Sequence, residues 1–366
     1  MLKWIFVLLL AVPAWASTIV FSPPSGAPQG IQNRARITAD CEGGWIVAGN
    51  ADWAIFSGSW PHTRGFLWHE GQGGLLNLPT YLGLETSIVA DVADDGYCVG
   101  QLSHYEPPVP LEWIDGTVGA IAATGVAYAV TPSGHVAVGA IGTDFDVFAP
   151  VWWDANGVIH LLPHGVGGSW ATGVSADGLT IIGVDNGSTY HNHRAVMWTA
   201  PDWEMTYLDD LGSHVNGVSP NGVYLTGNRD TDDVYTREYL YWVLPDVVPR
   251  PAPDDFHLRG PVADTGRMLG SVRYEADGHI WYEPGYWDAE GGGAPVELID
   301  RLESMDENVH LVSTLDLDAT GTYIVGWAHV LLGETIDYSV LYVAHLAPPT
   351  PQTASLTVER LQETPR

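Results

Sequence analysis

The stretch "GVSADGLTIIG", residues 173–183, decides the fold of this chain. It reads as a short strand, a polar turn with a glycine, and a β-branched strand that a second glycine closes. Asp177 and Gly178 can adopt the positive φ that a tight hairpin requires, and Thr180 to Ile182 have the composition of a strand. The stretch therefore predicts a β-hairpin.

The same hairpin pattern recurs along the chain. Six other stretches combine a polar pair and glycine with a following apolar strand: "TADCEGGWIVAG" (38–49), "ADDGYCVG" (93–100), "TPSGHVAVG" (131–139), "SPNGVYLTG" (219–227), "ADTGRMLG" (263–270) and "DATGTYIVG" (318–326). Repeats of 20 to 50 residues are typical of solenoids and propellers, because one unit cannot bury its own faces.

Each copy is followed by a short strand that ends in an aromatic residue. These aromatics are Trp68, Trp113, Trp153, Trp198, Trp242, Trp287 and Tyr342. A further apolar strand follows, as in "LLNLP" (75–79) and "VELID" (296–300). Four strands in each repeat of about 45 residues, with no helical period, predict an all-β fold: a seven-bladed β-propeller of four-stranded antiparallel blades. We expect the six tryptophans of this set to lie in the core between blades.

The last repeat lacks its fourth strand, since prolines follow "SVLYVAHL" (339–346). The segment "STIVF" (17–21) has the β-branched composition of the missing strand. We therefore predict that the N-terminal strand closes blade seven. The propeller then spans 17–346, with repeats starting near residues 34, 88, 126, 170, 214, 257 and 311, and 347–366 form a disordered tail.

These repeats resemble those of exported bacterial HAF-repeat proteins, whose units read approximately A-x-G-V-S-A-D-G-x-x-x-V-G. "ATGVSADGLTIIG" (171–183) and "RAVMW" (194–198) match best, and "VNGVSPNGVYLTG" (215–227) is close. The His-Ala-Phe strand that names the family is present only as variants such as "RGFLW" (64–68). The resemblance implies the propeller fold; most members of the family have no assigned activity.

The first sixteen residues have the layout of a secretory signal peptide. Lys3 precedes an apolar run from Trp4 to Val12, and Ala14-Trp15-Ala16 is a small-x-small cleavage site. No later stretch has the ~20 apolar residues of a membrane helix. We expect a secreted or periplasmic protein, cleaved after Ala16 and not inserted in a membrane.

The chain carries 44 acidic residues against 14 lysines and arginines, a formal charge of −30. Such a field repels nucleic acid and argues against it as a partner. The charge suits either a solvated surface in a saline exterior or a store of cations. Cys41 and Cys98 fall in neighbouring repeats, and export leaves open whether they form a disulfide.

One charged group is predicted near the inner ends of the blades. Asp316, Arg36 and Asp91 occupy one equivalent repeat position in blades seven, one and two, where other copies have Gly173, Gly217 and Ala129. Adjacent blades would place the arginine between two aspartates, which is how a partly buried charge is tolerated. The alternative is three independently solvated charges.

A propeller places its second-to-third-strand loops on the same face as its blade connections, and here those loops are long and unlike one another. We expect any binding site on this long-loop face. The candidate binding residues are aromatics and histidines outside the repeat pattern: Trp53, Trp60, His62, His104, Tyr105, Tyr190, His279 and Trp281. The loop aromatics are platforms for a sugar ring or covers for a blade edge.

The same loops contain candidate metal ligands. His191 and His193 would lie on one side of an extended segment and could chelate a metal with a loop carboxylate, or be solvated loop histidines. Asp144, Asp146, Asp230 and Asp232 are the acidic candidates for a divalent cation. Asp316-x-Asp318-x-x-Gly321 is rejected as a calcium loop, because its glycine is the repeat's hairpin glycine and the later Glu is absent.

No catalytic motif is present: there is no Gly-x-Ser-x-Gly, His-Glu-x-x-His, P-loop or dinucleotide fingerprint. We favour a binding module for an extracellular glycan or partner protein over an enzyme. The alternative is a glycan-active or metal-assisted hydrolase or lyase that uses loop His and Asp residues on the same face. No cofactor is assigned, with a divalent cation as the candidate, and the oligomeric state is not predicted.

Overall fold

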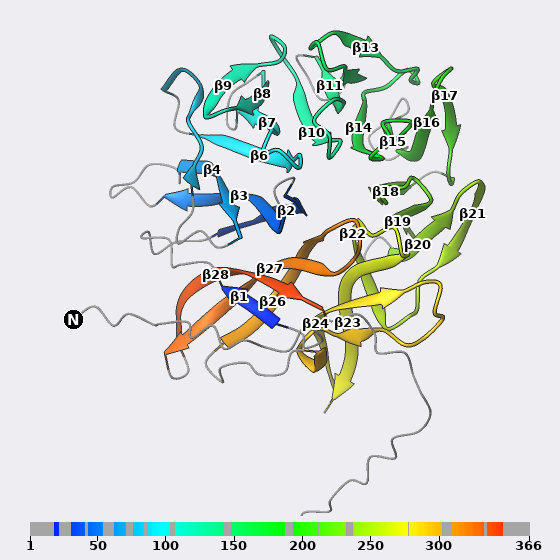
Figure 1. Ribbon diagram of the computed structural model, residues 1–366. Helices are drawn as coiled ribbons and strands as arrows, with labels where there is room; N and C mark the ends of the chain where they lie inside the picture. Colours follow the sequence, from blue (N-terminus) through cyan, green and yellow to red (C-terminus); the bar gives the residue numbers. More distant parts are fainter. Residues whose placement is uncertain are drawn as a thin grey trace, which may run out of the picture.

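The computed structural model describes most of the chain. The described residues are 18–21, 31–40, 43–53, 62–70, 76–83, 86–102, 107–142, 148–186, 193–210, 212–231, 237–276, 278–301, 309–332 and 335–346. They form seven four-stranded antiparallel sheets that surround a common centre, and the fold is the predicted seven-bladed β-propeller (Figure 1).

The blades follow one another along the chain, each running from an inner to an outer strand. Blade 1 contains β2 (Ile31–Ala39), β3 (Trp45–Trp53), β4 (His62–His69) and β5 (Leu76–Asn77). Blade 2 contains β6 (Ser87–Val92), β7 (Cys98–Leu102), β8 (Val109–Ile114) and β9 (Thr117–Ala120). Blade 3 contains β10 (Val126–Val130), β11 (Ala137–Ile141), β12 (Ala149–Trp153) and β13 (Ile159–Leu161).

The next three blades repeat this order. Blade 4 contains β14 (Ser169–Val174), β15 (Thr180–Asp185), β16 (Arg194–Thr199) and β17 (Glu204–Tyr207). Blade 5 contains β18 (Ser213–Val218), β19 (Tyr224–Asp230), β20 (Arg237–Val243) and β21 (Asp246–Pro251). Blade 6 contains β22 (Phe256–Val262), β23 (Arg267–Ala276), β24 (His279–Asp288) and β25 (Val296–Glu297). Two 3₁₀ turns, η1 (Tyr81–Gly83) and η3 (Ile299–Arg301), lie in blade connections.

Blade 7 joins the two ends of the chain. It contains β26 (Val309–Leu317), β27 (Tyr323–Leu332), β28 (Thr335–His345) and, as its outer strand, β1 (Thr18–Phe21). The register pairs Thr18 with His345 and Phe21 with Tyr342. In Figure 1 the blue strand β1 lies among the orange-red strands of the C-terminal part. The predicted closure of the ring is confirmed.

The two glycines of the repeat have separate structural roles. Gly178 has φ of +72°, the left-handed conformation that its hairpin turn requires. Gly183 lies opposite a bulge in β14, and a Cβ at this position would fall on the carbonyl oxygen of Trp170 and against the ring of Trp198. The inner and middle strands can therefore approach closely only because the second glycine has no side chain.

The repeat aromatics form the core between blades, as predicted for the six tryptophans. All seven are 6% exposed or less. Trp198 of blade 4 packs with Val138 of blade 3, and Trp68 of blade 1 packs with Val325 and Leu341 of blade 7. Each aromatic thus buries its ring against the preceding blade, so the stability of every blade depends on its neighbour.

The charged group at the inner strands is present in a modified form. Arg36 Nη1 lies 3.6 Å from Asp316 Oδ1, and the negative charges of Asp316 and Asp91 both raise the pKa of Arg36 against the effect of its burial. Asp91 also accepts hydrogen bonds from the backbone N–H of Val92 (3.0 Å) and Val130 (2.9 Å). Asp316 likewise accepts one from Ile37 at 3.0 Å. At this repeat position, therefore, each aspartate accepts a hydrogen bond from a backbone N–H on the inner strand of the following blade.

The connections on one face lie close together. Gly212, between blades 4 and 5, donates to the carbonyl of His193 at 2.8 Å, and Ser169 donates to that of Phe148 at 2.7 Å. We keep the name long-loop face for this side. The sequence places long loops at 271–284 and 327–337 on this face, but the described residues there form extended β-hairpins. The pairing of β23 with β24 continues to Ala276 and His279, and that of β27 with β28 continues to Leu332 and Thr335.

Two further expectations can be compared with the structure. Among the described residues, no helix is long and apolar enough to cross a membrane. Cys98 is buried with a free thiol. Cys41, the signal-peptide segment 1–16 and the tail 347–366 lie outside the described residues.

Candidate functional site

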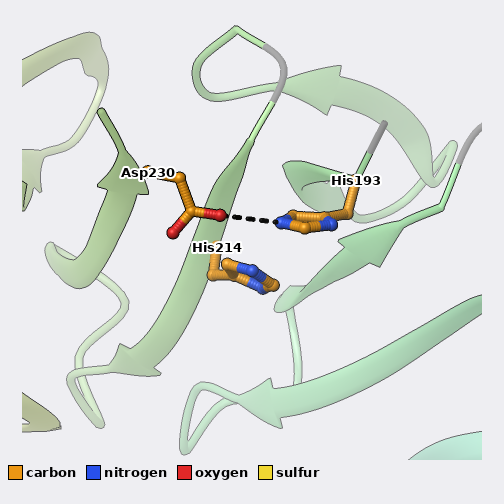
Figure 2. Close-up of side chains that lie close together, drawn as sticks. All are labelled: His193, His214 and Asp230. Atoms are coloured by element: carbon orange, nitrogen blue, oxygen red, sulfur yellow. Dashed lines mark ion pairs between the residues drawn. The ribbon is translucent and has the colours of Figure 1, made fainter. Parts of the chain in front are cut away.

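Three potential metal ligands meet between blades 4 and 5 on the long-loop face. His193 directly precedes β16, His214 is the second residue of β18, and Asp230 ends β19. The ligand atoms of the three side chains all lie within 4.8 Å of one another. Figure 2 shows the Asp230 carboxylate turned toward the His193 imidazole, with the His214 ring beside it.

Backbone hydrogen bonds hold the three segments together. The N–H of Gly212 donates to the carbonyl of His193 (2.8 Å), and the N–H of Asp230 donates to the carbonyl of Gly212 (3.0 Å). Buried Ser213 accepts a bond from the N–H of Ala195 (3.0 Å) and donates to the carbonyl of Asp210 (2.7 Å). The site therefore rests on ordered strand ends of two adjacent blades.

One nitrogen of this group has no hydrogen-bond partner among the described residues. His193 Nε2 lies 3.7 Å from Asp230 Oδ2 and is buried with no hydrogen-bond partner in the described part of the chain. The His193 and His214 ring centroids are 4.0 Å apart. Burial, followed by the proximity of His193, lowers the pKa of His214 to about 4, so its imidazole is neutral at neutral pH.

Arg237 joins this group to a neighbouring pocket. Its Nε lies 3.3 Å from Asp230 Oδ1, on the side of the carboxylate away from the oxygen that faces His193. Arg237 also lines an open pocket of about 550 Å³ between blades 5 and 6. The other lining residues are Asn216, Asn228, Tyr239, His257, Leu258, Arg259, Ser271 and Tyr282.

An aromatic stack forms one side of the pocket. The His257 ring lies between Tyr239 and Tyr282, with centroid distances of 4.8 and 4.7 Å. Burial lowers the pKa of His257, and the positive charges of Arg273 and Arg259 lower it further. The stack is therefore uncharged at neutral pH and offers flat apolar rings to a ligand.

The rest of the lining is cationic and polar. Arg237 and Arg259 are the charged residues among the described ones that line it, and none of these lining residues is acidic although acidic residues greatly outnumber basic ones in the chain. Arg259 is exposed and has no ion pair among the described residues. The side-chain oxygen of Asn228 is buried without a hydrogen-bond partner in this part of the structure, and such atoms are costly unless a water or ligand reaches them.

The structure describes only part of the predicted binding set. His279 and Trp281 lie on β24, exposed, with ring centroids 6.5 Å apart. Trp53 and His62 are paired in the register of β3 and β4, but their side chains lie outside the described residues. The remaining candidates, Trp60, His104, Tyr105 and Tyr190, also lie outside them. Tyr282, which lines the pocket, was not among the predicted residues.

Two of the predicted metal ligands come together with a third residue that the sequence did not indicate. His193 and Asp230 meet as described, and His214 completes the group. His214 starts a repeat, where the sequence gives it the appearance of a framework residue. Its signal in the sequence was its place at the start of blade 5, beside the loop of blade 4 that contains His191 and His193. The other candidates, His191, Asp144, Asp146 and Asp232, lie outside the described residues.

The fold identifies this chain as a seven-bladed β-propeller. Solved propeller structures are similar to it. The propeller domain of the Trilobed protease from Pyrococcus furiosus, reported with an open velcro topology, is 10% identical, with a TM-score of 0.54 over 90% of this chain and 100% of that one. Oligogalacturonate lyase from Vibrio parahaemolyticus is 10% identical, with a TM-score of 0.55 over 90% of this chain and 97% of the lyase.

A third similar structure is a larger enzyme. The acylaminoacyl peptidase of Pyrococcus horikoshii is 11% identical, with a TM-score of 0.55 over 90% of this chain, which spans 52% of the peptidase. At these identities the similarity shows the propeller fold alone. No family model and no curated relative matches the chain. Membership of the HAF-repeat family stays a prediction.

Proposed function

We propose that this protein is an exported binding module that holds an acidic glycan in the pocket between blades 5 and 6. Export is proposed from the signal-peptide layout of residues 1–16, and it would bring the long-loop face into contact with extracellular polymers. The pocket volume of about 550 Å³ is within the range that small ligands and short oligosaccharides occupy.

The carrying observation is the cationic lining of this pocket in a strongly acidic protein. Arg237 and Arg259 present guanidinium groups, whose planar forks match a carboxylate. The Tyr239–His257–Tyr282 stack supplies flat rings for the apolar face of a sugar. A uronate residue combines these two chemistries in one ring, whereas a neutral sugar would leave the Arg259 guanidinium without a charged partner among the described residues.

The buried oxygen of Asn228 supports a ligand rich in hydroxyl groups. It accepts no hydrogen bond within the described structure, and the pocket also contains Asn216 and Ser271. A sugar hydroxyl is a donor of the right size for such an oxygen. A flat protein partner would not reach into this recess, which favours a glycan over the second predicted ligand class.

Calorimetric titration with an oligogalacturonate and with its neutral methyl ester tests the proposal. The acid should bind saturably, and the ester at least about tenfold more weakly, because charged hydrogen bonds contribute roughly 1.5–3 kcal/mol. Arg259→Gln and Tyr282→Ala should each weaken binding of the acid about tenfold. A sulfated oligosaccharide in parallel shows whether carboxylate or anionic charge in general is recognised.

Matched controls come from the same region. Arg250→Gln removes an arginine that pairs with Asp246 at 3.3 Å on the outer strand β21, and Trp281→Ala removes an exposed aromatic next to Tyr282 that does not line the pocket. Both should bind normally. If Trp281→Ala loses binding while Tyr282→Ala retains it, the originally predicted aromatic surface is the binding site and the pocket is not.

The alternative, a glycan-cleaving enzyme, has one specific observation in its favour. His257 is held uncharged beside Arg259 and Arg273, so it could accept a proton from a sugar whose carboxylate the arginines neutralise. Incubation of the protein with polymer distinguishes the two: chain shortening that His257→Gln abolishes would identify an enzyme, and saturable binding without shortening would identify a binding module.

A further inference from the structure

We propose that His193, His214 and Asp230 form a transition-metal site for an ion such as Zn²⁺, with three protein ligands and one open coordination position. This site goes beyond glycan binding and does not depend on it. The three residues are the cluster of metal-ligating side chains found in the described part of the chain.

The donor set suits zinc rather than calcium or magnesium. Two imidazoles with one carboxylate are a donor set that Zn²⁺ commonly takes, while the hard alkaline-earth ions require mostly oxygen ligands. Three protein ligands with an open position are typical of zinc sites that bind a further molecule. The fourth position would face the long-loop side, where Asp230 is partly exposed.

The separations require only side-chain adjustment. Ligand atoms bound to one tetrahedral Zn²⁺ lie ~3.4 Å apart, as follows from metal–ligand distances of about 2.0–2.2 Å. His193 Nε2 and Asp230 Oδ2 are already 3.7 Å apart, and no pair exceeds 4.8 Å. The backbone bonds that tie His193, Gly212 and Asp230 together mean that the strand ends need not move.

Two features show that the site points to a ligand. His193 Nε2 is buried and lacks a hydrogen-bond partner among the described groups, and the His193 ring lies against that of His214, with 4.0 Å between the centroids. The two carboxylate oxygens of Asp230 have different partners, since Oδ1 pairs with Arg237 and Oδ2 faces His193. Arg237 would thereby orient the carboxylate as an outer-shell partner, leaving Oδ2 for the metal.

Metal analysis of the purified full chain tests the site directly. The protein is stripped with a chelator, exposed to Zn²⁺, dialysed and measured for bound metal, and Co²⁺ is then used as a spectroscopic probe. We expect one equivalent of Zn²⁺ and the visible absorption of four-coordinate Co²⁺. His214→Gln and Asp230→Asn should each weaken metal binding at least tenfold.

The matched control is His160→Gln. His160 Nε2 lies 3.3 Å from Asp154 Oδ2, so it forms a similar histidine–carboxylate pair, with no third ligand among the residues that the structure describes. This variant should bind Zn²⁺ like the unmodified protein. Equal metal content in Asp230→Asn and the unmodified chain, or loss only in His160→Gln, would overturn the proposal. Because Asp230 is at an exposed strand end, its variant decides the question even if His214→Gln does not fold.

This experiment is independent of the glycan titration. If metal binds and oligogalacturonate does not, the metal site stands and the proposed function fails. If the glycan binds and no variant alters metal content, the reverse holds.

Discussion

Asp316 places a carboxylate at an inner-strand position where several repeats have glycine or alanine. Burial raises its pKa to about 6, although Arg36 and the N–H of Ile37 oppose that rise. Asp91, in the equivalent position, also has a raised pKa for the same first cause. Asp316 and Asp91 connect neighbouring blades through their hydrogen bonds. In both residues, burial of the carboxyl favours the protonated form over the charged one.

The raised pKa of Asp316 predicts a pH-dependent stability. Below pH ~3 the carboxyl is protonated in both folded and unfolded states, so it has no effect on the free energy of unfolding. As pH rises from 3.8 through about 6, the carboxyl ionises first in the unfolded state. This ionisation lowers the free energy of the unfolded state by about 3 kcal/mol relative to the folded state. The contribution is therefore destabilising, and it is complete above pH ~6.

Asp316→Asn should remove this pH-dependent contribution to the free energy of unfolding, since the amide cannot ionise. Urea unfolding should give similar stabilities for the variant and the unmodified protein at pH ~3, and a variant more stable by up to ~3 kcal/mol at pH 7. Asp115→Asn, an exposed turn substitution with the same change in net charge, should show no such trend. A constant difference between Asp316→Asn and the unmodified chain across this range would contradict the prediction.

The group of His193, His214 and Asp230 could be predicted only in part from the sequence. His193 and Asp230 could be proposed because each lies in or beside a variable loop. His214 could not, because it occupies the first positions of a repeat and its partners belong to an adjacent blade and to the next strand. Spacing along a chain reports neighbours within a blade, whereas this site is made by contact between blades.

At the scale of elements, β1 is a four-residue strand on which the closure of the ring depends. Among the described strands it pairs with β28 alone, as the outer strand of blade 7. In an antiparallel pair, consecutive residues alternate between directing their N–H to the partner strand and away from it. Ile19 and Val20 therefore have opposite roles in the ladder.

Single proline substitutions should separate these roles. Of Ile19→Pro and Val20→Pro, one removes a ladder hydrogen bond and should lower the melting temperature by several degrees, while the other directs its missing N–H outward and should melt closer to the unmodified protein. Thermal unfolding followed by circular dichroism measures both. If neither variant melts earlier, β1 does not stabilise the ring.

Strand and turn positions in the repeats could be predicted because each unit carries the same polar turn, two glycines and a final aromatic. The long hairpins of blades 6 and 7 could not. Residues 271–284 contain charged and turn-forming residues that suggest a loop, yet β23 pairs with β24 from Arg267 to Ala276 around a turn at Gly278. Pairing between two strands, rather than the composition of either, extends the sheet there.

At the scale of the whole molecule, 44 acidic residues against 14 basic ones generate strong self-repulsion. The positive side chains are not evenly placed, since Arg237 and Arg259 line one pocket and Arg273 lies close to its His257. An acidic ligand would thus meet repulsion at long range and attraction only within the pocket.

Salt should stabilise this protein. Increasing NaCl from about 0.01 to 0.15 M shortens the Debye length from roughly 30 to 8 Å and screens repulsion across the surface. We expect the melting temperature to rise by several degrees over this range and to change little beyond it. A melting temperature that falls steadily with NaCl would show that attractive ion pairs, such as Arg267 with Asp288 at 2.8 Å, outweigh the repulsion.

The pairing of Thr18–Phe21 with residues 342–345 also predicts the order in which parts of the propeller form during folding. A ribosome makes β1 first and β28 last, so the strand waits for a partner about 330 residues away. Bringing such distant segments together costs about 5 kcal/mol of chain entropy, which four paired residues offset only once the blades between them are packed. Six blades and a three-stranded seventh should therefore assemble before β1 docks, and the same seam should be the first to open on unfolding.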